Sequence, residues 1–120
     1  MASRIKRNGQ RGRIPNGARY VGRPSIYGNP WPVEQLMRSD PTLTRDEAQI
    51  HAVLNHAAWL EGEGPDHIRC GSRIYDRKLV LARITDGDLT GRDLACSCDP
   101  DQPCHADTLI ALAAGQVRHA

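Results

Sequence analysis

The sequence predicts an α/β fold in which a small single-layer parallel sheet is flanked by helices, a reduced Rossmann-like arrangement. Short apolar segments of strand character and segments of helical periodicity follow one another in the order strand, helix, helix, strand, helix, which favours parallel strands. A length of 120 residues fits one domain. The chain has no Phe and few other aromatic residues, so its core must be mainly aliphatic.

The first strand is expected over residues 18–22, a short segment that contains Tyr20 and Val21. It leads into a loop over residues 23–32, where three prolines fix φ and a Gly-Asn-Pro sequence favours a turn. A helical turn over residues 33–38 should end before Pro41, because the residue in front of a proline avoids the helical conformation.

The clearest helix is expected over residues 45–61. Thr44 is a favourable N-cap residue, and Glu47 three positions later completes a capping box. His51 and His56 lie on this helix but do not share a face, so both are predicted to be surface residues. An apolar stripe at helical spacing runs along the same segment and consists of Ile50, Val53, Leu54, Ala57 and Leu60.

The second half of the chain is expected to contain one more strand between two helices. Residues 66–74, which include Cys70, form a connection, and residues 76–84 fit a helix, although so short an apolar run also fits a strand. The last strand is predicted over residues 93–98. Pro103 suits the first position of the final helix, which should end near Gly115.

Charge is distributed unevenly along the chain. The formal net charge is only +2, yet residues 1–33 hold seven basic residues and no acidic residue. We therefore expect a basic flexible arm over residues 1–17 in front of a single α/β domain over residues 18–120. The arm is either a solvated tail or a contact for nucleic acid or phosphate. Its basic residues are Arg4, Lys6, Arg7, Arg11 and Arg13.

The sequence also predicts a cellular compartment. No apolar run approaches the ~18 residues that span a bilayer. The basic N-terminus is not followed by the apolar segment of a secretory signal. We therefore expect a cytoplasmic protein without membrane contact, whose four cysteines are reduced thiols or metal ligands rather than disulfides.

Three of these cysteines and one histidine lie within residues 96–105, at the predicted turn from the last strand to the final helix. Open α/β sheets bind ligands at such turns, because the carboxyl end of a strand meets a helix N-terminus there. Cys96 and Cys98 would share one face of the strand, since side chains alternate along it. Cys104 falls in the first turn of the helix, where the helix dipole favours a thiolate.

This cysteine–histidine turn allows three interpretations. In the first, a ligand sits at the helix N-terminus, and Cys104 and His105 contact it or act on it as nucleophile and acid or base. In the second, Cys96, Cys98, Cys104 and His105 bind zinc; the residue types suit a tetrahedral ion, but the spacing departs from the usual Cys-x₂₋₄-Cys pairs. In the third, the cysteines are small buried residues and His105 is a polar cap.

The loop after the first strand should lie beside this turn, because parallel strands that end at one edge bring their following loops together. Arg23 offers a guanidinium for phosphate or carboxylate, Ser25 a hydroxyl, and Asn29 an amide that can read a base edge or a sugar. Together with Cys98 of the cysteine–histidine turn, these side chains are the predicted ligand-binding residues.

Two aromatic residues of the same loop, Tyr27 and Trp31, could stack on a flat ring. A purely structural interpretation is also open for this loop. In that case Gly28 supplies backbone freedom and Trp31 anchors the loop in the core.

The chain resembles domain-of-unknown-function family 4326, small proteins frequent in bacteriophages and actinobacteria. The similarity extends from about Arg4 to Ala114 and is carried by the segments VGRPSIYGNPW (residues 21–31), LTGRDLACSC (89–98) and QPCHADTL (102–109). Through its association with phages, the resemblance implies a role in nucleotide metabolism, nucleic-acid modification or counter-defence.

The residues favour binding of a nucleotide or nucleoside-like ligand where the two loops meet, and thiolate-based catalysis on that ligand would be a further step. The expected setting is phage or bacterial nucleic-acid or nucleotide metabolism. Arg23 would hold a phosphate or carboxylate, and Ser25 and Asn29 would orient the ligand. Two alternatives stay open: a zinc-stabilised module whose basic arm binds nucleic acid, and a non-catalytic sponge for a signalling nucleotide. A catalyst and a sponge need the same polar groups, so the sequence does not separate them.

Overall fold

A computed structural model describes residues 3–6, 17–23, 25–96, 98 and 101–115 of the chain. Within these residues the strands are β1 (Arg4–Lys6), β2 (Arg19–Tyr20), β3 (His67–Cys70), β4 (Arg73–Asp76) and β5 (Leu94–Cys96). The helices are α1 (Val33–Ser39), α2 (Arg45–Leu60), α3 (Arg77–Thr85) and α4 (His105–Ala113). None of these helices is long and apolar enough to cross a membrane.

The main sheet is parallel and has the strand order β1-β5-β2. β5 lies in the middle, and its three residues are all buried, as expected for an apolar strand that is flanked on both edges and covered by α4. Residue Ala95 at its centre is paired with Ile5 on one side and Tyr20 on the other. This confirms the predicted α/β class with a small parallel sheet.

The basic N-terminal segment differs from the predicted arm. Arg4–Lys6 form β1, which pairs with β5 from Arg4 opposite Leu94 to Lys6 opposite Cys96. These residues are therefore part of the sheet, because the exposed edge of β5 offers backbone hydrogen bonds that a free arm lacks. Arg7, Arg11 and Arg13 lie outside the described residues.

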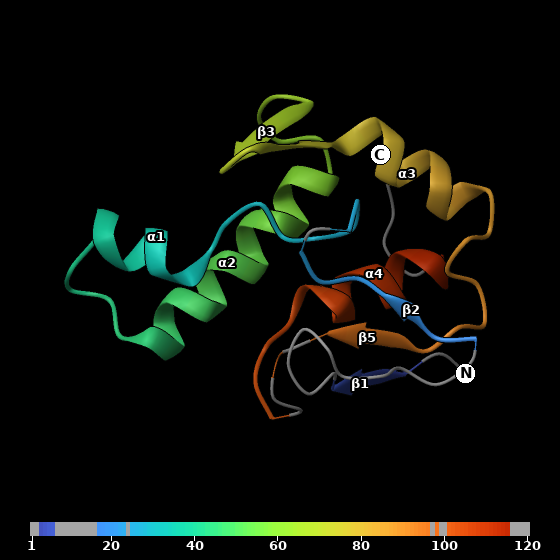
Figure 1. Cartoon of the computed structure of the whole chain (residues 1–120), viewed down its shortest axis with the longest axis horizontal. Helices are drawn as coiled ribbons and strands as arrows, with labels where there is room; N and C mark the ends of the chain where they lie inside the picture. The colour runs from blue at the N-terminus through green and yellow to red at the C-terminus, as the bar shows by residue number, and fades with distance from the viewer. Residues whose placement is uncertain (1–2, 7–16, 24, 97, 99–100, 116–120) are drawn as a thin grey trace.

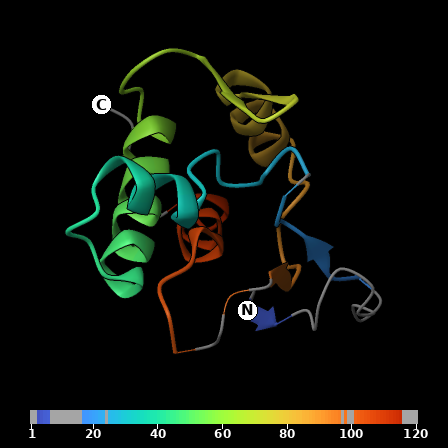
Figure 2. The same cartoon turned by 60° about the vertical axis from the view of Figure 1, so that its left-hand side comes forward.

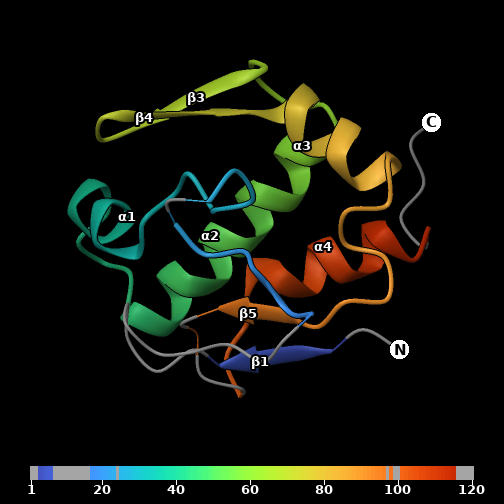
Figure 3. The same cartoon turned by 45° about the vertical axis from the view of Figure 1, so that its right-hand side comes forward.

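The helices stack outward from the sheet. α4 packs against β5, and α2 packs against α4, so that α4 lies between α2 and the sheet (Figures 1 and 2). α1 packs on α2. The hairpin β3–β4 and α3 lie at the end of the molecule opposite β1 and β5 (Figure 3). This antiparallel hairpin occupies the segment that the sequence predicted to be a plain connection.

The N-terminus of α2 agrees with the prediction, because Thr44 Oγ1 accepts a hydrogen bond from the backbone of Glu47 and the Glu47 side chain accepts one from the backbone of Thr44. Its buried face differs from the apolar stripe, since Ile50 and Leu54 are 45% and 61% exposed. The residues that α2 buries are Ala48, Ala52, His56, Trp59 and Leu60. Small residues face inward because neighbouring backbone approaches closely there: the Ala52 carbonyl accepts a hydrogen bond from the Asn29 side chain.

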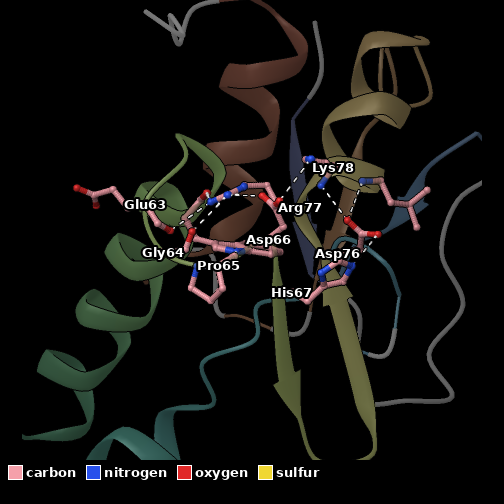
Figure 4. Close-up of polar contacts among 10 residues, drawn as sticks. Glu63, Gly64, Pro65, Asp66, His67, Asp76, Arg77 and Lys78 are labelled. Atoms are coloured by element: carbon pink, nitrogen blue, oxygen red, sulfur yellow. Dashed lines mark hydrogen bonds and ion pairs between the residues drawn. The ribbon is translucent and has the colours of Figure 1, made fainter.

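Arg77 joins the C-terminal end of α2 to the hairpin and α3 (Figure 4). Its guanidinium donates hydrogen bonds to the backbone carbonyls of Trp59 at 2.9 Å, Glu63 at 3.2 Å and Gly64 at 3.3 Å. It also forms an ion pair with Asp66. A single buried side chain thus satisfies the carbonyls that the end of α2 and its following turn leave without helical partners.

Candidate functional site

The loops that follow β2 and β5 meet at the carboxyl edge of the sheet and border a pocket of about 480 Å³. This volume lies in the range of small-molecule sites. Helices α1 and α2 form the rest of its wall. Polar, aromatic and sulfur-containing side chains line this pocket, among them Tyr20, Arg23, Asn29, Trp31, Glu34, Arg45, Gln49, Cys96, Cys98 and His105.

The cysteine–histidine turn brings its sulfur and nitrogen atoms together. The Sγ atoms of Cys96 and Cys104 are 3.2 Å apart, and those of Cys96 and Cys98 are 3.5 Å apart. His105 Nδ1 lies 3.7 Å from Cys104 Sγ. Cys70, in β3, is a free thiol that does not belong to this cluster. The tertiary structure therefore gathers the four residues of the predicted turn into one cluster, which we call the Cys3His cluster.

His105 joins the two loops. Its Nε2 lies 2.6 Å from the backbone carbonyl oxygen of Val21, directly after β2. A carbonyl oxygen only accepts hydrogen bonds, so Nε2 must carry the proton. In the neutral ring Nδ1 is then unprotonated, and its lone pair is directed to the side where Cys104 lies.

Two polar side chains approach the sulfurs from outside the cluster. The Arg4 guanidinium donates to the backbone carbonyl of Gln102 at 2.8 Å and forms an ion pair with Asp107 at 3.4 Å, so it is held by residues on both sides of Cys104 in the chain. Gln49 Nε2 lies 3.6 Å from Cys98 Sγ. Hydrogen bonding to Cys104 and Cys96 and, to a smaller extent, burial raise the pKa of the Cys98 thiol.

Cys104 itself has no access to the pocket. It is fully buried, acts as the N-cap residue of α4 without a side-chain capping bond, and does not line the cavity. Cys98 and His105 do line it. A nucleophile must reach the substrate atom it attacks, so this arrangement does not support direct attack by Cys104 on a ligand in the pocket.

The predicted loop residues have different surroundings. Arg23 is exposed at the pocket wall, where its Nη1 donates to the Asn29 carbonyl at 2.9 Å. The Asn29 side chain is buried and committed to the fold, since it donates to the carbonyl of Ala52 and accepts from the backbone of Trp31, both at 2.9 Å. Ser25 lies outside the pocket lining, where its hydroxyl accepts a hydrogen bond from the backbone of Tyr27.

Tyr27 and Gly28 also serve the fold. Tyr27 is fully buried, its hydroxyl donates to the Asp88 carboxylate, and burial raises its pKa. Gly28 has an ordinary negative φ, so its role differs from the predicted backbone freedom. A Cβ at Gly28 would lie 3.1 Å from the Tyr75 ring and 2.9 Å from the Arg23 side chain, so only glycine leaves room for this contact.

Tyr20, Glu34, Arg45 and Gln49 line the pocket but were not predicted from the sequence. Trp31, which was predicted either to stack on a ligand or to anchor the loop, lines the pocket half-buried, with its ring packed edge-on against Trp59. Arg45 and Glu34 form an exposed ion pair at 3.3 Å between α2 and α1. Their positions depend on how α1 and α2 pack over the loop, and no local sequence signal reports that packing.

His56 differs most from its prediction as a surface residue. It is fully buried, its ring packs edge-on against His105 with 5.3 Å between the ring centroids, and neither ring nitrogen has a hydrogen-bond partner among the described residues. Burial, with a smaller effect of His105, lowers its pKa well below the usual range, so the ring is neutral. His56 thus forms part of the packing behind the Cys3His cluster.

Comparison with known proteins identifies the family. No curated protein and no solved structure showed a significant match to the chain. The family model described as "Domain of unknown function (DUF4326)" matches residues 4–115, which include both strands of the pocket edge and the whole Cys3His cluster. This confirms the resemblance seen in the sequence, and the chain belongs to the DUF4326 family.

Proposed function

We propose that this chain binds a nucleotide-like ligand, an aromatic ring that carries phosphate, in the pocket at the carboxyl edge of β2 and β5. The single observation that carries the proposal is the convergence of guanidinium groups and aromatic rings on one cavity of about 480 Å³. Rossmann-like sheets bind nucleotides at the same edge, which supports the proposal by analogy.

Arg23 is the residue best suited to hold the phosphate. It is exposed, while its bond to the Asn29 carbonyl holds the guanidinium in place at the wall. A guanidinium has five N–H donors, so one bond to a carbonyl leaves donors for a bidentate contact with phosphate oxygens.

Arg45 can supply a second charge. Its ion pair with Glu34 is solvent-exposed, with about 60% of each side chain accessible, and such pairs contribute only ~0–1 kcal/mol. A phosphate group can therefore displace Glu34 at little cost. The Trp31 ring, half-buried and supported by Trp59, offers a surface on which a base could stack.

The proposal is for binding without a covalent step, because Cys104 is buried away from the cavity. This favours a sponge or a binding subunit over the thiolate nucleophile. The proposal also places the protein in phage or bacterial nucleotide or nucleic-acid metabolism. This setting is argued from the family association.

The test is isothermal titration of the purified protein with AMP, ATP, GTP, cyclic dinucleotides, adenosine and inorganic phosphate. We expect at least one nucleotide to bind, and Arg23→Gln to weaken it about 10- to 100-fold, since hydrogen bonds to a charged group contribute ~1.5–3 kcal/mol. Arg69→Gln is the matched control, because Arg69 is exposed on β3 outside the pocket. Absence of binding by every probe, or an equal loss in both variants, would contradict the proposal.

A further inference from the structure

We propose that Cys96, Cys98, Cys104 and His105 bind one zinc ion at the end of β5. The inference does not depend on the ligand proposed for the pocket, because it rests only on the donor atoms of the Cys3His cluster and on the groups around them.

The distances suit a tetrahedral ion. Zinc–sulfur bonds of about 2.3 Å place two sulfurs of a tetrahedron about 3.8 Å apart. The sulfur pairs measure 3.2 and 3.5 Å, and His105 Nδ1 lies 3.7 Å from Cys104 Sγ. The donor atoms of Cys96, Cys104 and His105 all lie within 4.8 Å of one another. Cys98 Sγ lies outside this group of three and touches it through its 3.5 Å contact with Cys96 Sγ, so the Cys98 side chain has to move toward His105 to complete the tetrahedron.

The orientation of His105 is that of a metal ligand. The bond from Nε2 to the Val21 carbonyl fixes the ring and leaves Nδ1 unprotonated on the side of the sulfurs. Metal-binding histidines usually donate their other N–H to a carbonyl or carboxylate in this way. A histidine that served only as a helix cap would have no need of a lone pair directed at buried thiols.

The groups around the sulfurs favour anionic ligands. A zinc ion with three thiolates and a neutral imidazole carries a net charge of −1. The Arg4 guanidinium is bound to the Gln102 carbonyl and to the Asp107 carboxylate, on either side of Cys104 in the chain, and the Gln49 amide lies 3.6 Å from Cys98 Sγ. Both are donors, and donors stabilise thiolates rather than neutral thiols.

The donor set selects the metal. Thiolate and imidazole ligands in a tetrahedral arrangement suit zinc, whereas magnesium and calcium require oxygen ligands. The ion would connect β5 to the N-terminus of α4 and, through His105, to the loop after β2. Cys96, Cys98 and His105 also line the pocket, so the zinc site would form part of its wall.

The first experiment measures metal in the protein as it is expressed. Protein purified under reducing conditions without chelator is analysed by native mass spectrometry and elemental analysis, and we expect one zinc per chain. A chain that carries iron, or a metal-free chain whose mass corresponds to four reduced thiols, would overturn the proposal.

The second experiment tests whether thiolates bind the metal, and it does so in the wild-type protein because variants of these residues can fold poorly. Wild-type protein is stripped with chelator, kept reduced and titrated with Co²⁺. We expect an endpoint at one equivalent with the strong visible absorption of tetrahedral cobalt bound to thiolates. A featureless titration would overturn the site even if the stripped protein is partly unfolded.

Variants then separate ligation from folding at His105. His105→Gln can still donate to the Val21 carbonyl but is a poor zinc ligand, whereas His105→Cys loses that bond and keeps a ligand. We expect His105→Cys to retain zinc, and His105→Gln and Cys104→Ser to lose more affinity than the ~10- to 100-fold that is typical when a residue that only orients a ligand is changed. Cys70→Ser is the control and should retain zinc. Full retention in Cys104→Ser would contradict the proposal.

Discussion

The Nη1 atom of Arg77 donates a hydrogen bond of 2.9 Å to the backbone carbonyl of Trp59, and both residues are buried. This bond holds the C-terminal end of α2 against the start of α3, while the N-terminal half of α2 contributes Arg45, Gln49 and Ala52 to the pocket wall. One side chain therefore connects the hairpin end of the molecule to the helix on which the candidate site is built.

Replacing Arg77 by lysine should destabilise the fold. Lysine retains the charge but cannot reproduce the planar set of donors that reaches the three carbonyls of Trp59, Glu63 and Gly64. We expect Arg77→Lys to lower the free energy of unfolding by about 2–4 kcal/mol. Urea denaturation followed by circular dichroism measures the change. Lys78→Met, at an exposed side chain of the same helix, should shift it by no more than ~1 kcal/mol, and equal losses in the two variants would refute the role of Arg77.

The ion pair of Asp66 with Arg77 predicts a dependence of stability on pH. Hydrogen bonding from Arg77 lowers the pKa of Asp66 in the folded state, whereas the unfolded chain has the ordinary value of about 3.9. The unfolded state therefore binds the proton first, so this contribution to stability is present above pH ~4 and is lost as pH falls further.

Asp66→Asn removes this titration, so its stability should decline less steeply than that of the wild type between about pH 4 and pH 2. The measurement is a series of urea denaturation curves at pH 7, 4, 3 and 2. Parallel pH profiles for the two proteins would show that Asp66 does not contribute to acid sensitivity.

Asn29 is predicted to support the fold rather than to read the ligand. Asn29→Ala leaves the carbonyl of Ala52 and the N–H of Trp31 without their partners, which should cost about 1–3 kcal/mol of stability. Asn55→Ala, on the partly buried face of α2, should stay within ~0.5 kcal/mol. A variant at Asn29 with unchanged unfolding but weaker nucleotide binding would instead assign the side chain to the ligand.

Much of this protein follows from local sequence. The capping box of Thr44 and Glu47 determines where α2 begins, because two side chains satisfy backbone donors within one turn. The buried strand β5, the helix after it and the parallel sheet class are likewise set by apolar patterning. The cysteine–histidine turn could be singled out as a candidate site because its residues are close in sequence.

Only the tertiary structure decided which faces and which roles these residues take. Ile50 and Leu54 were part of the most regular apolar stripe, yet they are exposed, while His56 is buried beside His105. The reason is that close approach of α4 and the Asn29 loop requires alanines at the inner face of α2, a condition that periodicity does not express. In the same way, Arg4 reaches Gln102 and Asp107 beside the Cys3His cluster only because β1 pairs with β5, a contact between residues at opposite ends of the chain.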